Sequence, residues 1–89
     1  MPGFYGMDVD AIRVLAGQLA FKADEIDTIA TTLSTQIDGA SWSGPDADSF
    51  RSDWATSYRT QLTAVAGALR DASTRATNNA NQQAEVSST

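Results

Sequence analysis

The chain has 89 residues, a formal net charge of −5 at pH 7, and neither histidine nor cysteine. This length accommodates one small domain, so we expect a single domain over residues 1–89. The negative charge argues against nucleic acid as a partner, and the missing residue types exclude thiol nucleophiles, imidazole bases and the usual zinc ligands.

The start of the chain does not have the character of a secretory leader. Residues 1–7 lack a basic segment followed by an apolar one. No apolar run in the sequence approaches the ~20 residues that a membrane span needs. We therefore expect no membrane span, and a route without a cleaved leader if the protein leaves the cell.

The first predicted helix covers residues 8–37, with Asp8 as its N-cap and Gly39 as its stop. Large and small apolar residues form one continuous seam along it. Four large residues recur every seven positions, and each is followed four positions later by a seam residue that is usually alanine: Ile12, Leu19, Ile26 and Leu33, then Ala16, Ala23, Ala30 and Ile37. The alanines would let a neighbouring helix approach closely.

The apolar surface of this helix is wider than one seam. Leu15 and Ile29 extend it on one side, in register with Lys22 and Gln36, and the apolar arc covers roughly 160°. One neighbouring helix cannot cover so wide an arc. Val14 and Phe21 lie nearly opposite the seam, where they are either scattered surface residues, which are common, or a second contact with another chain.

A turn is predicted over residues 39–45, and it contains Trp42, Ser43 and Gly44. Gly44 lets the backbone turn sharply into Pro45. Trp42 either folds back over the first turns of the next helix and closes that end of the molecule, or projects as a recognition knob. The two roles are compatible if Trp42 contacts a segment of another subunit.

The second predicted helix covers residues 45–80, with Pro45 at its first position and acidic residues in its first turn. An apolar stripe follows at helical spacing and comprises Phe50, Trp54, Tyr58, Leu62, Val65, Leu69, Ala72 and Ala76. Beyond it the stripe positions become Asn79 and Gln83, so we expect fraying and a flexible tail over residues 81–89. The tail is either an ordinary terminus or a segment that folds when a partner binds it.

These helices predict an all-α fold, a helix-turn-helix hairpin with antiparallel helices. Two helices alone leave half of each stripe in water, and disulfides or metals are not available to stabilise so small a core. We therefore predict a four-helix-bundle dimer. The expected hairpin and dimer core comprises Ile12, Leu15, Leu19, Ile26, Ile29, Leu33, Ile37, Phe50, Trp54, Tyr58, Leu62, Val65 and Leu69.

No pattern in the sequence indicates a catalytic, cofactor or metal site. Asp46, Asp48 and Asp53 lack the glycine and the distal glutamate of a calcium loop, and acids at a helix N-terminus are explained by the helix dipole. Serine and threonine are plentiful, but no base is present to activate one. We expect a protein that is not an enzyme and takes no small-molecule substrate.

A helical hairpin with Trp42-Ser43-Gly44 in its turn and aromatic residues just after it resembles the WXG family, the small ESAT-like substrates of type VII (ESX) secretion. The resemblance covers about residues 8–83, and residues 44–54 are similar to the start of the second helix in actinobacterial members. It implies a leaderless export in the folded state, as a homodimer or a heterodimer with another WXG-like protein. It also implies contact with the secretion ATPase, and a cytoplasmic location before export.

The chain departs from the family pattern at its C-terminal end. Many members carry a Tyr-x-x-x-Asp/Glu signal there, whereas the only tyrosines here, Tyr5 and Tyr58, are followed four residues later by Val9 and Leu62. Either a partner supplies the export signal, or this chain uses a different tail signal or none.

Two functions follow from this reading. The first is a secreted, non-enzymatic substrate or partner subunit that acts through dimerisation and protein–protein contacts. The alternative is a cytosolic targeting chaperone that pairs with the helical N-terminal domain of a larger secreted effector.

Overall fold

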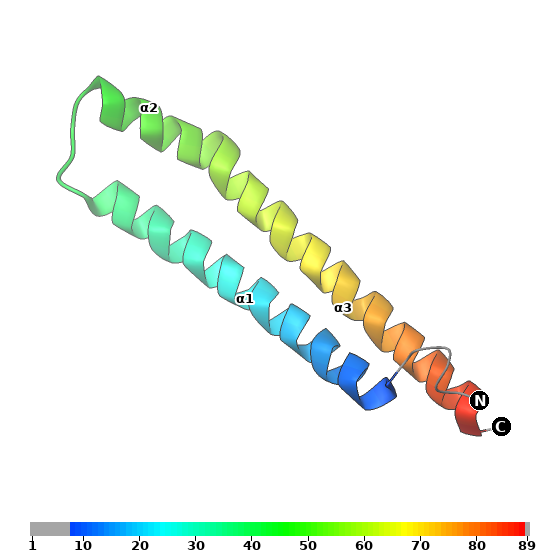
Figure 1. Ribbon diagram of the computed structural model, residues 1–89. Helices are drawn as coiled ribbons and strands as arrows, with labels where there is room; N and C mark the ends of the chain where they lie inside the picture. Colours follow the sequence, from blue (N-terminus) through cyan, green and yellow to red (C-terminus); the bar gives the residue numbers. More distant parts are fainter. Residues whose placement is uncertain (1–7, 89) are drawn as a thin grey trace.

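The computed structural model describes residues 8–88, and these form one antiparallel helical hairpin (Figure 1). α1 spans Val9–Gly39, α2 spans Pro45–Asp53, the π-helical turn η2 spans Trp54–Tyr58, and α3 spans Arg59–Ser88. α2, η2 and α3 follow one another without a break and make up the second arm. The predicted all-α hairpin is thus confirmed. Residues 1–7 and 89 of the predicted single domain lie outside the described residues.

The hairpin is a thin rod rather than a globule. Its extents are 66 × 16 × 15 Å and its radius of gyration is 19.6 Å, whereas a compact domain of this length has a radius of gyration of about 12 Å. The molecule therefore consists of a single pair of helices, and each arm has whole sides that no other part of the hairpin covers.

α1 begins where the sequence predicts and ends later. The Asp8 carboxylate accepts a hydrogen bond from the backbone N–H of Ala11 at 3.1 Å, which confirms Asp8 as the N-cap. The helix includes Gly39, predicted as its stop, and gives way to extended backbone at Ala40. Arg51 explains the extension, because its guanidinium donates to the carbonyl oxygens of Ile37 at 3.1 Å and Ala40 at 3.2 Å. The Ile37 carbonyl is one that a helix C-terminus leaves without a backbone partner, whereas the Ala40 carbonyl also accepts the N–H of Trp42 at 2.8 Å.

The bend between the arms depends on Gly44. Its φ of 118° makes it the only residue with a positive φ among residues 8–88, and a side chain would strain that conformation. Pro45 then begins α2, and the N–H of Asp48 bonds the Gly44 carbonyl at 3.0 Å. The predicted turn is confirmed, although it spans Ala40 to Gly44 rather than residues 39–45.

Small residues fill the contact between the arms. Ala16, Ala23 and Ala30 of α1 are at most 4% exposed, and the buried residues of the second arm are Ala47, Trp54, Ala66 and Ala80. No large side chain is completely buried among the described residues. The arms thus approach closely while covering little apolar surface.

The contact face of the second arm shifts by one residue at η2. Ala47 and Trp54 are buried seven positions apart, but a straight continuation of that spacing would bring Gln61 and Ala68 against α1, and both are exposed. Leu62 and Leu69 are half-buried instead. The N–H of Arg59 bonds the Trp54 carbonyl, five residues back rather than four. This wider turn takes up the extra residue.

The same shift overturns the prediction that the helix ends near residue 80 and gives way to a tail. α3 continues to Ser88. Past η2 the contact positions fall on Ala80, which is 0% exposed, rather than on Asn79. The Asn81 side chain also accepts a hydrogen bond from Arg13 at 3.1 Å. The seam therefore does not turn polar where the unshifted spacing placed Asn79.

Candidate functional site

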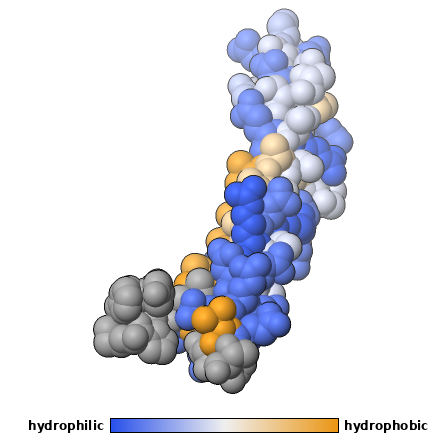
Figure 2. Space-filling view, turned by 90° about the vertical axis from the view of Figure 1, so that its right-hand side faces the viewer, coloured by the Kyte–Doolittle hydropathy of each residue, from blue (hydrophilic) through white to orange (hydrophobic). Residues whose placement is uncertain are grey.

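The most extensive candidate site is a strip of exposed apolar side chains, which we call the apolar face. It comprises Leu15 and Ile29 of α1, 44% and 50% exposed, Tyr58 of η2, 44% exposed, and Val65 of α3, 48% exposed. Half-buried leucines and isoleucines of the predicted core lie between these flanks and the alanine seam: Ile12, Leu19, Ile26, Leu33, Ile37, Leu62 and Leu69. Hydrophobic residues correspondingly gather along one edge of the rod in Figure 2, beside a mostly polar surface.

Helix geometry places both flanks of the apolar face on one side of the hairpin. Leu15 directly precedes the buried Ala16, and Val65 directly precedes the buried Ala66. One step back along a right-handed helix turns a side chain by ~100°. Because the two arms run in opposite directions, this step turns Leu15 and Val65 toward the same side. The apolar face therefore spans both helices.

The opposite side of the hairpin carries charge. Arg70 lies between Asp24 and Asp27, with its guanidinium 2.7 Å and 2.6 Å from their carboxylate oxygens. The hydrogen bonds to Asp24 and then Asp27 raise the pKa of Arg70 above its usual value. This bridge joins the arms across the face that lacks the apolar strip, so the two sides of the rod differ in chemistry.

The bend carries a second candidate surface, the aromatic cluster of Trp42, Phe50 and Tyr58. The ring centroids of Trp42 and Phe50 are 5.8 Å apart, and those of Phe50 and Tyr58 are 6.4 Å apart, both in tilted arrangements. These are favourable aromatic contacts. All three rings remain exposed, Trp42 to 46%. Trp42 thus packs on α2 and also presents a large surface to solvent.

Trp54 is not part of this cluster, although the sequence places it on one stripe with Phe50 and Tyr58. It is 8% exposed, and its indole N–H donates to the Ser34 hydroxyl at 2.9 Å. Ser34 in turn donates to the Ala30 carbonyl at 2.8 Å. Trp54 is therefore the one large side chain that is buried between the arms among the described residues, and it is not available to a partner.

Besides the Trp54–Ser34 and Arg13–Asn81 hydrogen bonds, three contacts between the arms were not predicted from the sequence. They are the Arg51 contact with the end of α1, the Arg70 bridge, and the Ser73 hydroxyl that donates to the Ala16 carbonyl at 2.7 Å. Only the sign of Arg51, a cation close to a helix C-terminus, could have indicated its role. The other two depend on the register between the arms.

Residues 8–88 offer no cluster of acidic side chains with the geometry to hold a metal ion. Within the same part of the chain, none of the helices combines the length and hydrophobicity that crossing a membrane requires.

Comparison with known proteins adds no relative. No family model, no curated protein and no solved structure matches this chain.

Proposed function

We propose that this chain is a non-enzymatic secreted protein of the WXG type, a substrate or partner subunit of type VII secretion that acts through dimerisation. In this proposal two hairpins join through their apolar faces and form a four-helix bundle. The observation that carries the proposal is the exposure of Leu15, Ile29 and Val65, each between 44% and 50%, on one side of the hairpin.

The composition of the core supports association. The alanine seam and Trp54 supply little buried apolar area, and apolar burial contributes roughly 25 cal/mol per Å² to stability. A rod of this kind gains most by covering its apolar face with another apolar surface. The half-buried leucines beside the seam would become fully buried in such a bundle.

The aromatic cluster supports the export part of the proposal. In a bundle joined along its length, the bend with Trp42 and Phe50 stays at one end and remains open to the secretion machinery. The WXG resemblance rests on the same residues, with Gly44 in the conformation that requires glycine. Since the chain lacks a Tyr-x-x-x-Asp/Glu signal, we propose that a partner chain supplies it.

The mass of the protein in solution tests the dimer. We expect light scattering to give twice the chain mass at micromolar concentration. Val65→Asp, which places a charge on the apolar face, should raise the dissociation constant by more than about tenfold. The matched control Thr63→Asp adds the same charge to an exposed position of the same helix and should leave the dimer intact. A wild-type chain that is folded and monomeric at this concentration would refute the proposal.

Export is tested by following the chain in the medium of a cell with a type VII system. Trp42→Ala should reduce the exported fraction more than Arg59→Ala does. Recovery of the chain only from the cytosol, bound to the helical domain of a larger effector, would instead favour the targeting-chaperone function.

A further inference from the structure

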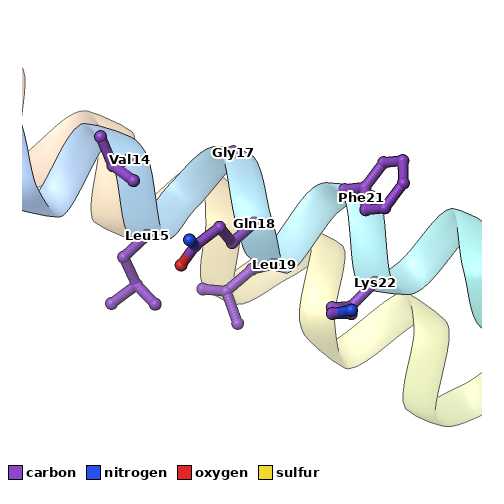
Figure 3. Close-up of a pocket in the computed structure, with 7 residues that line it drawn as sticks. All are labelled: Val14, Leu15, Gly17, Gln18, Leu19, Phe21 and Lys22. Carbon is purple, nitrogen blue, oxygen red and sulfur yellow. The ribbon is translucent and has the colours of Figure 1, made fainter.

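A second apolar surface lies on α1, on the side turned away from α3. Val14 and Phe21 each stand two residues before a buried alanine, which turns them by roughly 200° around the helix from the seam. They are 61% and 62% exposed. They line an open hollow of about 730 Å³ that is formed by residues of α1 alone and extends around the helix to Leu15 and Leu19 of the apolar face. In Figure 3, Val14 and Phe21 project from one side of α1 while Leu15 and Leu19 project from the other.

The hollow has the form of a helix-packing socket. Val14, Gly17, Gln18 and Phe21 stand at positions i, i+3, i+4 and i+7, the four-residue diamond that receives one side chain of a facing helix. Gly17 makes this socket deep because it has no side chain. Within the hairpin nothing requires glycine there, since a Cβ on Gly17 would meet no atom within 4 Å. Glycine inside a helix nevertheless costs about 1 kcal/mol relative to alanine.

The socket lies beside the side chain that can fill it in a second copy. Phe21 stands four residues after Gly17 on the same face. If two α1 helices pack antiparallel about a two-fold axis level with residue 19, each Phe21 inserts over the Gly17 of the other copy. Such reciprocity, with i on j and j on i, defines a two-fold contact.

Charges agree with this arrangement. In the same register, Arg13 of one copy lies opposite residue 25 of the other, one residue from Asp24. Arg13 and Asp24 both lie on the charged side of the hairpin. The Asp24 side chain is 71% exposed while it binds Arg70, so its carboxylate can accept a further donor. Two Arg13–Asp24 pairs would form across the axis.

From these observations we propose that the outer side of α1 is a homotypic contact through which Phe21 of one copy occupies the Gly17 socket of a second copy. This contact is centred on Gly17 and Phe21, adjoins the apolar face at Leu15 and Leu19, and would join the proposed dimers into larger assemblies. Its occupant is a second copy of this chain, because the Phe21–Gly17 contact and the Arg13–Asp24 pair are each reciprocal in the self-paired register.

A single introduced cysteine tests the register directly, since the chain has no cysteine of its own. Gln18→Cys places thiols of two copies beside the proposed axis, where their Cα atoms come within the roughly 4.4–6.8 Å that a disulfide usually bridges. We expect Gln18→Cys to give a disulfide-linked dimer under mild oxidation. Thr63→Cys, at an exposed position of α3, should give at least tenfold less of the disulfide-linked dimer. Equal yields from the two variants would overturn the proposal.

Filling the socket provides the second test. Gly17→Leu should lower the amount of species larger than the dimer by at least about tenfold in sedimentation velocity, and its helix content should not fall because leucine favours helix more than glycine. Gly67→Leu is the matched control, since Gly67 is also a helical glycine with open space around it, on the other arm. Unchanged assembly of Gly17→Leu would refute the proposal. If the apolar-face dimer alone were wrong, the Gln18→Cys disulfide would still form.

Discussion

The one-residue shift at η2 predicts that two single-alanine deletions differ strongly in their effect on stability. Ala55 lies within η2 and Ala68 lies within α3, and both are exposed. Deleting Ala55 lets the wide turn become an ordinary helical turn, so every later residue keeps its face toward α1. Deleting Ala68 rotates all later residues by ~100° and turns the contact residues of α3 away from α1.

The structure gives the size of the difference. After deletion of Ala68, the hairpin loses the partial burial of Leu69, the burial of Ala80, and the hydrogen bond from Ser73 to Ala16. It also loses the contacts of Arg70 and Asn81 with α1, which are exposed and contribute little. Roughly 1 kcal/mol for each apolar group and about 1 kcal/mol for the hydrogen bond give a loss of about 3 kcal/mol. Deletion of Ala55 should change the free energy of unfolding by less than about 1 kcal/mol, because no burial is lost.

Urea unfolding followed by far-ultraviolet circular dichroism measures both values. All variants must be compared at one protein concentration, since association adds to apparent stability. The Ala68 deletion is expected to lower the unfolding midpoint strongly, and the Ala55 deletion is not. A loss after deletion of Ala55 as large as that after deletion of Ala68 would show that η2 does not absorb an extra residue.

Four further substitutions test individual contacts by the same unfolding measurement. Trp54→Ala should cost about 3–5 kcal/mol, as for a buried aromatic side chain, and Trp42→Ala about 1–2 kcal/mol because only the ring contact and part of the burial are lost; a reversed order would contradict the assignment of Trp54 as the anchor. Gly44→Ala should cost about 1–3 kcal/mol through backbone strain at positive φ, and a neutral effect would show that the bend adapts. Arg51→Met keeps the aliphatic stem but leaves the end of α1 without its donor, so we expect a loss of about 1–2 kcal/mol, and an unchanged midpoint would mean that water replaces the guanidinium.

Local signals were sufficient to predict the hairpin itself. Asp8 as a cap and the seam of α1 depend only on neighbours in sequence, and the structure confirms both. Pro45 at the start of the second helix and Gly44 before it define the bend by their own backbone preferences. These features need no knowledge of the other arm.

The second arm shows where such reasoning fails. Phe50, Trp54 and Tyr58 follow one another in steps of four, a spacing compatible with a regular helix, and no residue type in 54–58 identifies a π-helical turn. The turn is explained by the need for Trp54 and Leu62 to face α1 together, which is a property of the packed pair. Leu62 and Leu69 were placed correctly, but the line through Tyr58 was continued to Asn79 instead of Ala80, and so the end of the helix was predicted too early.

The candidate surfaces were only partly predictable for the same reason. The wide arc on α1 indicated that Leu15 and Ile29 would need cover, and both are exposed on the single hairpin. The spacing could not predict that Trp54 is buried while Trp42 is exposed, because the burial of Trp54 depends on Ser34 of the other arm.

The alanine seam has a calorimetric consequence. The heat capacity of unfolding rises with the apolar area that becomes hydrated, typically to 12–15 cal/mol/K per residue in globular domains. A methyl-lined contact hydrates little new apolar area when it opens, so one isolated rod should have a smaller value per residue. Its stability curve would then be shallow, with slow change across ambient temperatures and a broad melting transition.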